Sequence, residues 1–453
     1  MEQNNKMGTM PMPKLVINMS LPLMISLLVQ SLYNIVDSIF VARIGENALT
    51  AVSLAYPIQL LMIAVSVGTS VGVNALLAQS IGAKHEEATK NIATTGMLLA
   101  IAGMVVFLVL GLTCTGLFVN MFTQDEAIGA WCRQYLFICM IFCGGTFIST
   151  MFQRFLQSVG DTFDSMISLV SGAVTNLILD PIMIFGLLGF PALGIRGAAI
   201  ATVIGQWVSA AVAVALNTAR NPIVRVGMKG FHFDRSVMVK IYKVGLPTII
   251  TQALGSVMLS AVNAILISFS STAVAFFGVY YKLQNFLFMP MNGLGQAAIP
   301  IAGYSYGAGR KDRIMDLLKT ILPLAVGIAV MITIVFMAFP SQLLQIFSAS
   351  EEMLELGVPA LRMISVTFAF GAVTIILGYS MSGLGNGVVN MMGTALRQVI
   401  VLVPCIWILS KYLGVDMAWY GFWISEAAGC LYAALASRRE LKKKGISGTG
   451  QHS

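Results

Sequence analysis

Long, almost uncharged apolar runs recur along the whole chain, and they restrict the possible folds more than any other feature. A bilayer core accepts helices of about 20 apolar residues, because lipid cannot satisfy an unpaired backbone polar group. Of the 453 residues, 57% are apolar and only 10% are charged, whereas soluble domains carry about 25% charged residues. The sequence therefore predicts an all-α integral membrane protein.

The spacing of the runs predicts twelve transmembrane helices. They are expected at residues 15–42, 50–80, 91–119, 128–157, 163–188, 195–217, 242–269, 273–306, 314–340, 353–382, 389–412 and 415–437. No cleavable signal peptide is expected, because the first run is too long and no small-residue cleavage site follows it. Deep prolines are expected to kink or end helical turns: Pro57, Pro181, Pro290, Pro300, Pro323 and Pro404.

The net charge of +8 is explained by membrane topology rather than by a nucleic-acid partner. In the twelve-helix arrangement most Lys and Arg residues fall in loops on one side. Only Arg43, Arg133, Arg196 and Lys411 fall near the other side. Basic loops stay in the cytoplasm, so a multi-pass protein of the cytoplasmic (inner) membrane is predicted, with both termini cytoplasmic.

An internal repeat divides the chain into two similar halves. Leu21-Pro22 recurs as Leu246-Pro247, Gly68 as Gly293 and Gly160 as Gly385, all at an offset of 225 residues. Each half holds six helices, an even number, so the halves share one orientation and are related by a pseudo-twofold axis along the membrane normal. Parallel repeats of this kind are typical of transporters. The predicted domains are an N-terminal lobe (1–219), a cytoplasmic linker (220–240) and a C-terminal lobe with a basic tail (241–453).

The first predicted helix contains one carboxylate, Asp37. Gln30, Tyr33 and Asn34 share its helix face, at offsets of three, four and seven residues. A carboxylate inside a bilayer is costly, so such an acid indicates function by default. The alternative is a polar residue near a helix end that reaches the interface.

A second group of polar residues is expected at the same depth. With a rise of 1.5 Å per residue, Asp37 lies roughly 33 Å along the first helix and Asp180 roughly 25 Å along the fifth. Asn176 shares a face with Asp180, and Tyr135 on the fourth helix reaches a similar outer depth. Two acids, an amide and a phenol can form a proton or sodium site. For Asp180 the alternative is an acid at the helix end before Pro181.

The C-terminal half has no matching acids, so ion coupling is assigned to the N-terminal half. The charged residues inside the predicted helices of the C-terminal half include Lys282, Arg362 and Glu426, while Arg397 is expected near the cytoplasmic rim. The six cysteines lie in or beside apolar runs and the three histidines in loops or the tail, so no cofactor or resident metal is predicted beyond a possible Na⁺ at Asp37 and Asp180. With no histidine in the bundle, an enzyme is not expected.

Several motifs together resemble the MATE (multidrug and toxic compound extrusion) family, in its prokaryotic DinF- and MepA-like branch. They are Leu21-Pro22 with Asp37, Gly82-Ala83-Lys84, Gln157 to Asp161, Asn176 to Pro181, Gly194 to Ala199, and Thr394 to Gln398. The resemblance covers essentially all twelve helices. It implies an H⁺- or Na⁺-coupled antiporter that exports amphipathic, often cationic drugs by alternating access, and we expect it to be a monomer in the lipid bilayer.

The resemblance also implies roles for individual residues. The cation-coupling set would be Asp37, Asp180, Asn176, Tyr135 and Thr202. The substrate-binding set would be Gln30, Tyr33, Asn34, Gln153 and Gln284. The alternative function is a flippase for lipid-linked oligosaccharide or lipid, which would need a basic cavity for pyrophosphate, with Lys282 and Arg397 as candidates.

Overall fold

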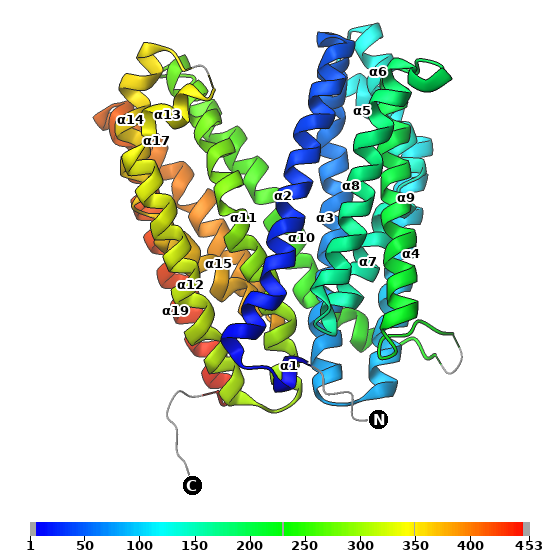
Figure 1. Ribbon diagram of the computed structural model, residues 1–453. Coiled ribbons are helices and arrows are strands. Elements are labelled where there is room, and N and C mark those ends of the chain that lie inside the picture. The colour runs from blue at the N-terminus through cyan, green and yellow to red at the C-terminus, as the bar shows by residue number, and fades with distance from the viewer. Residues whose placement is uncertain (1–5, 229–230, 348, 447–453) are drawn as a thin grey trace. The chain divides into compact units, whose positions relative to one another are not determined.

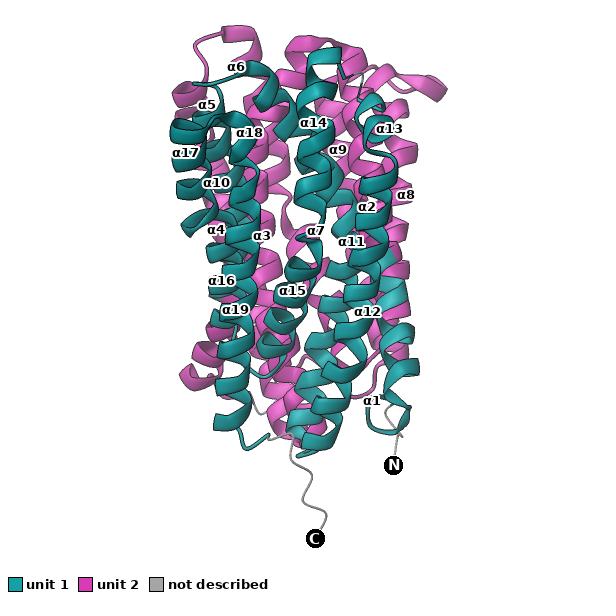
Figure 2. Cartoon of the chain, turned by 90° about the vertical axis from the view of Figure 1, so that its left-hand side faces the viewer, with its two compact units in different colours: residues 1–24, 246–453 teal, residues 25–245 magenta. Residues whose placement is uncertain are grey.

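The computed structural model describes residues 6–228, 231–347 and 349–446, and these residues form helices and connecting turns without any strand (Figure 1). They separate into two compact units (Figure 2). Unit 2 comprises Ile25–Gly245, and unit 1 comprises Met1–Met24 with Leu246–Ser453. The boundaries fall inside two long helices, α2 (Met12–Ile44) and α10 (Arg235–Leu266), so each of these helices contributes to both units.

Unit 2 is built mainly from helices of the first half of the chain. Besides its parts of α2 and α10, it contains α3 (Glu46–Gly82), α4 (Glu86–Thr113), α5 (Thr115–Phe122), α6 (Glu126–Ile141), α7 (Gly144–Ser158), α8 (Thr162–Phe185), the 3₁₀ turn η1 (Leu187–Gly189) and α9 (Ile195–Arg220). The pair α6 and α7 forms one bent segment with an angle of 46°.

Unit 1 repeats this order with helices of the second half. It contains α1 (Lys6–Thr9), α11 (Ser271–Gly307), α12 (Lys311–Ala338), α13 (Pro340–Gln345), α14 (Glu351–Ser365), α15 (Phe368–Gly383), α16 (Val388–Ala395), the π-helical turn η2 (Leu396–Ile400), α17 (Leu402–Leu413), α18 (Val415–Ala418) and α19 (Tyr420–Lys443). Here α14 and α15 form the bent segment, with an angle of 49°.

All twelve predicted transmembrane segments correspond to helices of the described chain. Eight single helices are long and apolar enough to cross a membrane, and the two bent pairs raise the number to ten. The remaining two predicted segments are α11 and α19. The deep prolines do not end α3, α8, α11 and α12, which continue as helices through them.

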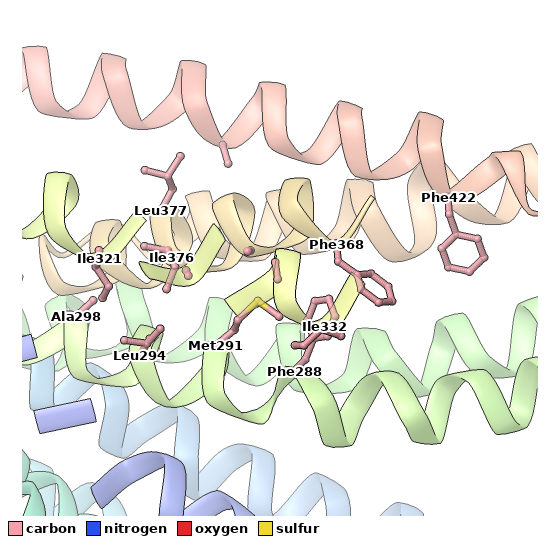
Figure 3. Close-up of a cluster of buried hydrophobic side chains, with 14 of the residues drawn as sticks. Phe288, Met291, Leu294, Ala298, Ile321, Ile332, Phe368, Ile376, Leu377 and Phe422 are labelled. Atoms are coloured by element: carbon pink, nitrogen blue, oxygen red, sulfur yellow. The ribbon is translucent and has the colours of Figure 1, made fainter. Parts of the chain in front are cut away.

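The core of unit 1 is a continuous cluster of buried apolar side chains (Figure 3). Phe288 and Phe336 both pack edge-to-face against Phe368, at ring-centroid distances of 5.1 and 5.2 Å. These rings join α11, α12 and α15. Edge-to-face pairs add to the contribution of area burial, so they fix how the three helices pack.

The segment after α9 is held against unit 2 rather than extending freely. Asn221 Oδ1 accepts hydrogen bonds from the backbone N–H groups of Ile223 and Val224, and Val224 is fully buried. Thr94 on α4 accepts a bond from the Gly227 N–H at 3.2 Å. Helix α10 then begins at Arg235, inside the predicted linker range 220–240.

Candidate functional site

In unit 2, Asp37 on α2 and Asp180 on α8 are in contact with each other. Their carboxyl groups are hydrogen-bonded to each other. Asp180 is completely buried and Asp37 is partly buried. Two carboxylates cannot share a hydrogen bond unless one holds a proton, so the pair in this geometry carries at most one negative charge. The predicted meeting of these two acids is present in the structure.

The sequence of α8 explains how Asp180 is positioned. Asp161 caps the start of the helix by accepting a bond from the Asp164 N–H at 3.1 Å, and Gly186 ends it in a left-handed conformation with φ of 74°. Halfway along, Gly172 lies against Gly205 of α9 so closely that a Cβ on Gly172 would stand 2.7 Å from the Gly205 carbonyl oxygen. Small residues permit this close approach of two membrane helices.

Asn176 connects the acid pair to α9. Its amide nitrogen donates to Asp180 Oδ1 at 3.3 Å and to Thr202 Oγ1 at 3.4 Å. With the amide rotated by 180°, the nitrogen donates to Asp180 Oδ2 at 3.1 Å and the oxygen accepts from the Thr202 N–H at 3.2 Å. The contact with Asp180 is therefore present in either orientation of the amide.

Tyr135 on α6 is buried, with electrostatic interactions to both acids. Its hydroxyl is hydrogen-bonded to Gln59 of α3, and Gln59 is also bonded to Cys139, one helical turn after Tyr135. Gln59 was not among the predicted site residues. The sequence feature that could have identified Gln59 is its position as an amide in the middle of the second apolar run, two residues after Pro57.

The predicted substrate-binding residues of α2 precede Asp37 on the same helix, and their exposures differ. Tyr33, one turn before Asp37, interacts electrostatically with Asp37, Asp180 and Tyr56. Tyr33 and Gln30 are partly buried, while Asn34 is exposed. The structure thus places an aromatic ring next to the acids, and an exposed amide one turn before Asp37 on the same helix.

Gln153 lies away from the acid pair, and Gln284 belongs to the other unit. Gln153 on α7 donates to the hydroxyls of Ser168 and Ser209, both at 3.2 Å. Ser168 precedes Asp180 by three turns of α8, which is roughly 18 Å along the helix. Gln284 is a partly buried residue of α11 in unit 1. The structure therefore does not bring Gln153 into the set around Asp37, and the substrate contact of Gln284 stays a prediction.

Arg397, which was expected near the cytoplasmic rim, is buried within unit 1 and paired with an acid. Arg397 lies in η2, its side chain is 9% exposed, and Nε is 3.2 Å from Oε1 of Glu426 on α19, whose side chain is 6% exposed. Its Nη1 also donates to the Gly371 carbonyl oxygen at 3.4 Å. A buried arginine is tolerated here because its charge is compensated by a carboxylate and a backbone carbonyl. The sequence repeat did not reveal this pairing, since Glu426 aligns with an uncharged residue, Gln206.

The MatE family model matches the chain twice, over residues 22–182 and 247–407. The second match begins 225 residues after the first, which is the offset of the internal sequence repeat. Together the two matches cover well over half of the chain.

Relatives of similar length come from several bacteria. A protein named probable multidrug resistance protein NorM from Thermotoga maritima is 26% identical, with 90% of this chain and 88% of the relative aligned. Probable multidrug resistance protein YoeA of Bacillus subtilis is 28% identical over the same shares. Multidrug export protein MepA of Staphylococcus haemolyticus is 24% identical, with 93% and 92% aligned.

Solved structures show the same fold. A structure described as "Crystal structure of MATE in complex with MaL6" superimposes with a TM-score of 0.91 at 23% identity, covering 99% of this chain and 100% of that one. An outward-facing MATE transporter of the MOP superfamily gives a TM-score of 0.90 at 24% identity, with 98% and 99% covered. These matched proteins are transporters rather than enzymes. From the double match of the family model over most of its length, this multi-pass membrane protein belongs to the MatE family.

Proposed function

We propose that the chain is a cation-coupled antiporter that exports amphipathic, often cationic drugs by alternating access. The observation that carries the proposal is the hydrogen-bonded carboxyl pair of Asp37 and Asp180 in a membrane-spanning bundle. Acids at this depth are costly and mark ion pathways in membrane proteins. The drug class is supported by the names of the relatives, which include multidrug resistance and multidrug export proteins.

The pair can take up a coupling ion in either of two forms. A second proton would neutralise the remaining carboxylate. Sodium would instead be bound by oxygen atoms of both carboxyl groups together with the Asn176 amide oxygen and the Thr202 hydroxyl oxygen, which belong to neighbouring side chains. Either ion removes net negative charge from the contact between α2 and α8.

Charge at the pair then controls how strongly a cationic drug binds. Tyr33 and Asn34 lie within one turn of Asp37, so a cation held there is attracted more strongly when the pair is negatively charged. Ion and drug consequently compete. Export requires that each binds the two transport states with different affinity, since a ligand without differential affinity shifts no equilibrium.

The distribution of basic residues supports the orientation of the transporter. Most Lys and Arg residues gather at one set of loops and at the C-terminal end of α19, which we assign to the cytoplasm with both termini. The membrane would be the cytoplasmic membrane, and the working unit a monomer. The flippase alternative receives less support, because its candidate Arg397 is already paired with Glu426.

Transport of ethidium in everted membrane vesicles tests the proposal. A proton gradient and a sodium gradient are imposed separately, and ethidium accumulation is followed by fluorescence. We expect accumulation under one gradient and not the other. No accumulation under either gradient would contradict drug–cation antiport and favour the flippase.

A further inference from the structure

A pocket of about 330 Å³ lies in unit 1, at the C-terminal end of α19. It is lined by Asn386, Val388, Val389, Tyr432, Leu435, Ala436, Arg439, Glu440 and Lys443. These residues come from α19, from the start of α16 and from the turn just before it, and the two helices pack side by side in unit 1 (Figure 2). We call this feature the α16–α19 pocket.

The pocket is apolar at one end and cationic at the other. Tyr432, Leu435 and Ala436 occupy the part of α19 that is deeper in the bundle, while Lys443 lies at its C-terminus, roughly 16 Å further along the helix from Tyr432. Val388 and Leu435 are exposed, with 41% and 47% of their surface accessible. An exposed apolar surface that leads to a pair of cations matches the two parts of a phospholipid, its acyl chain and its headgroup.

The one acid of the pocket does not cancel these cations. Glu440 accepts a bond from the Asn386 amide at 3.0 Å and lies 3.7 Å from Lys444 Nζ. Its charge is therefore already compensated by Lys444, which is not one of the two cations that line the pocket. In the described part of the chain, Arg439 and Lys443 form no ion pair, and both are exposed. The charge left at this end of the pocket is positive.

We propose that the α16–α19 pocket binds an anionic phospholipid of the cytoplasmic leaflet, with Arg439 and Lys443 on the phosphate and the apolar lining against an acyl chain. Basic pockets between helices at the cytoplasmic side are suited to anionic headgroups, and Arg can bind a phosphate through two parallel hydrogen bonds. The assignment of the pocket to the cytoplasmic leaflet rests on the orientation given under the proposed function. The binding itself requires no transport activity, so the two proposals can fail separately.

Native mass spectrometry of the purified full chain in detergent tests the site with dioleoyl phosphatidylglycerol as the probe. The chain supplies a matched control, because Arg438 and Lys442 are exposed neighbours of equal charge that do not line the pocket. Arg439→Gln/Lys443→Gln and Arg438→Gln/Lys442→Gln therefore remove the same charge from the same helix. Thermal unfolding of both variants without lipid checks that they are folded.

We expect one phosphatidylglycerol to stay bound to the wild-type protein and to Arg438→Gln/Lys442→Gln, and the bound fraction to fall at least about tenfold in Arg439→Gln/Lys443→Gln. Dioleoyl phosphatidylcholine should not be retained. An equal loss of bound phosphatidylglycerol in both variants would show that general surface charge retains the lipid, and would overturn the proposal. Displacement of the lipid by an equal concentration of glycerol phosphate would also overturn it, because the site would then bind a soluble phosphate without using the acyl chain.

Discussion

At the scale of residues, the acid pair is defined by what surrounds it. Asn176 holds Asp180 from within α8, and Thr202 holds Asn176 from α9. A site in which ion and drug share one negative charge has a direct consequence for binding. Ethidium bound to the purified protein should be displaced by acidification if the coupling ion is H⁺, or by added Na⁺ if it is sodium. Fluorescence titration measures this competition, and an affinity that changes with neither ion would contradict it.

The Tyr135–Gln59 contact predicts that a single and a double substitution at these residues change the free energy of unfolding by different amounts. Gln59→Leu leaves the buried Tyr135 hydroxyl without its amide partner, which should cost about 1–3 kcal/mol of unfolding free energy. Gln59→Leu/Tyr135→Phe removes both polar groups and should cost less than Gln59→Leu alone. Thermal unfolding in detergent compares the two. A double variant that is less stable than the single variant would contradict the assigned contact.

At the scale of elements, the approach of α8 and α9 positions the site. A Cβ at Gly205 would stand 2.8 Å from the Gly172 carbonyl oxygen and 3.1 Å from Asn176 Cβ. Gly205→Ala should therefore separate the two helices, destabilise the protein by about 1–3 kcal/mol and weaken ion coupling through Asn176. Gly278→Ala on α11 is the control, because nothing lies within 4 Å of its Cβ position. Equal melting temperatures and transport rates for the two variants would contradict this role of the contact.

The Arg397–Glu426 pair links η2 to α19. It predicts that loss of one charge destabilises the protein more than loss of both. Glu426→Gln leaves a buried guanidinium without its counter-charge and should cost about 3–5 kcal/mol. Arg397→Met/Glu426→Leu removes both charges and should recover most of that loss. Melting temperatures of the two variants test this. If the double variant is no more stable than Glu426→Gln, packing rather than charge explains the effect.

At the scale of the whole molecule, the apolar runs and the repeat predicted the helices, while the local breaks were not predicted. Runs of apolar residues identify membrane helices because lipid imposes a simple rule of length and polarity. The bends after Ile141 and Ser365 and the π turn at Arg397 contain no proline. They depend on tertiary contacts, such as Gly145, where a Cβ would stand 2.8 Å from the Trp207 backbone nitrogen. A single sequence carries no signal for such contacts.

In the candidate site, likewise, the residues on regular helices were predicted and the contacts that depend on helix packing were not. Depth along a regular helix brought Asp37, Asp180, Asn176 and Tyr135 together, because only the rise per residue was needed. Gln59 was missed because an amide in an apolar run has no preferred partner until α3 and α6 pack. The Arg397–Glu426 pair was missed for the same reason, since it joins two helices through a turn of irregular geometry.

The most direct test of the central claim is ethidium transport driven by the coupling-ion gradient in everted vesicles that contain Asp37→Asn, Asp180→Asn or a control. Asp416→Asn is the matched control, because it removes an exposed carboxylate of unit 1. With expression equal to wild type, we expect the rate to fall at least about tenfold in Asp37→Asn and in Asp180→Asn, and to remain unchanged in Asp416→Asn. Gradient-driven transport at the wild-type rate in both site variants would contradict the assignment of ion coupling to the carboxyl pair.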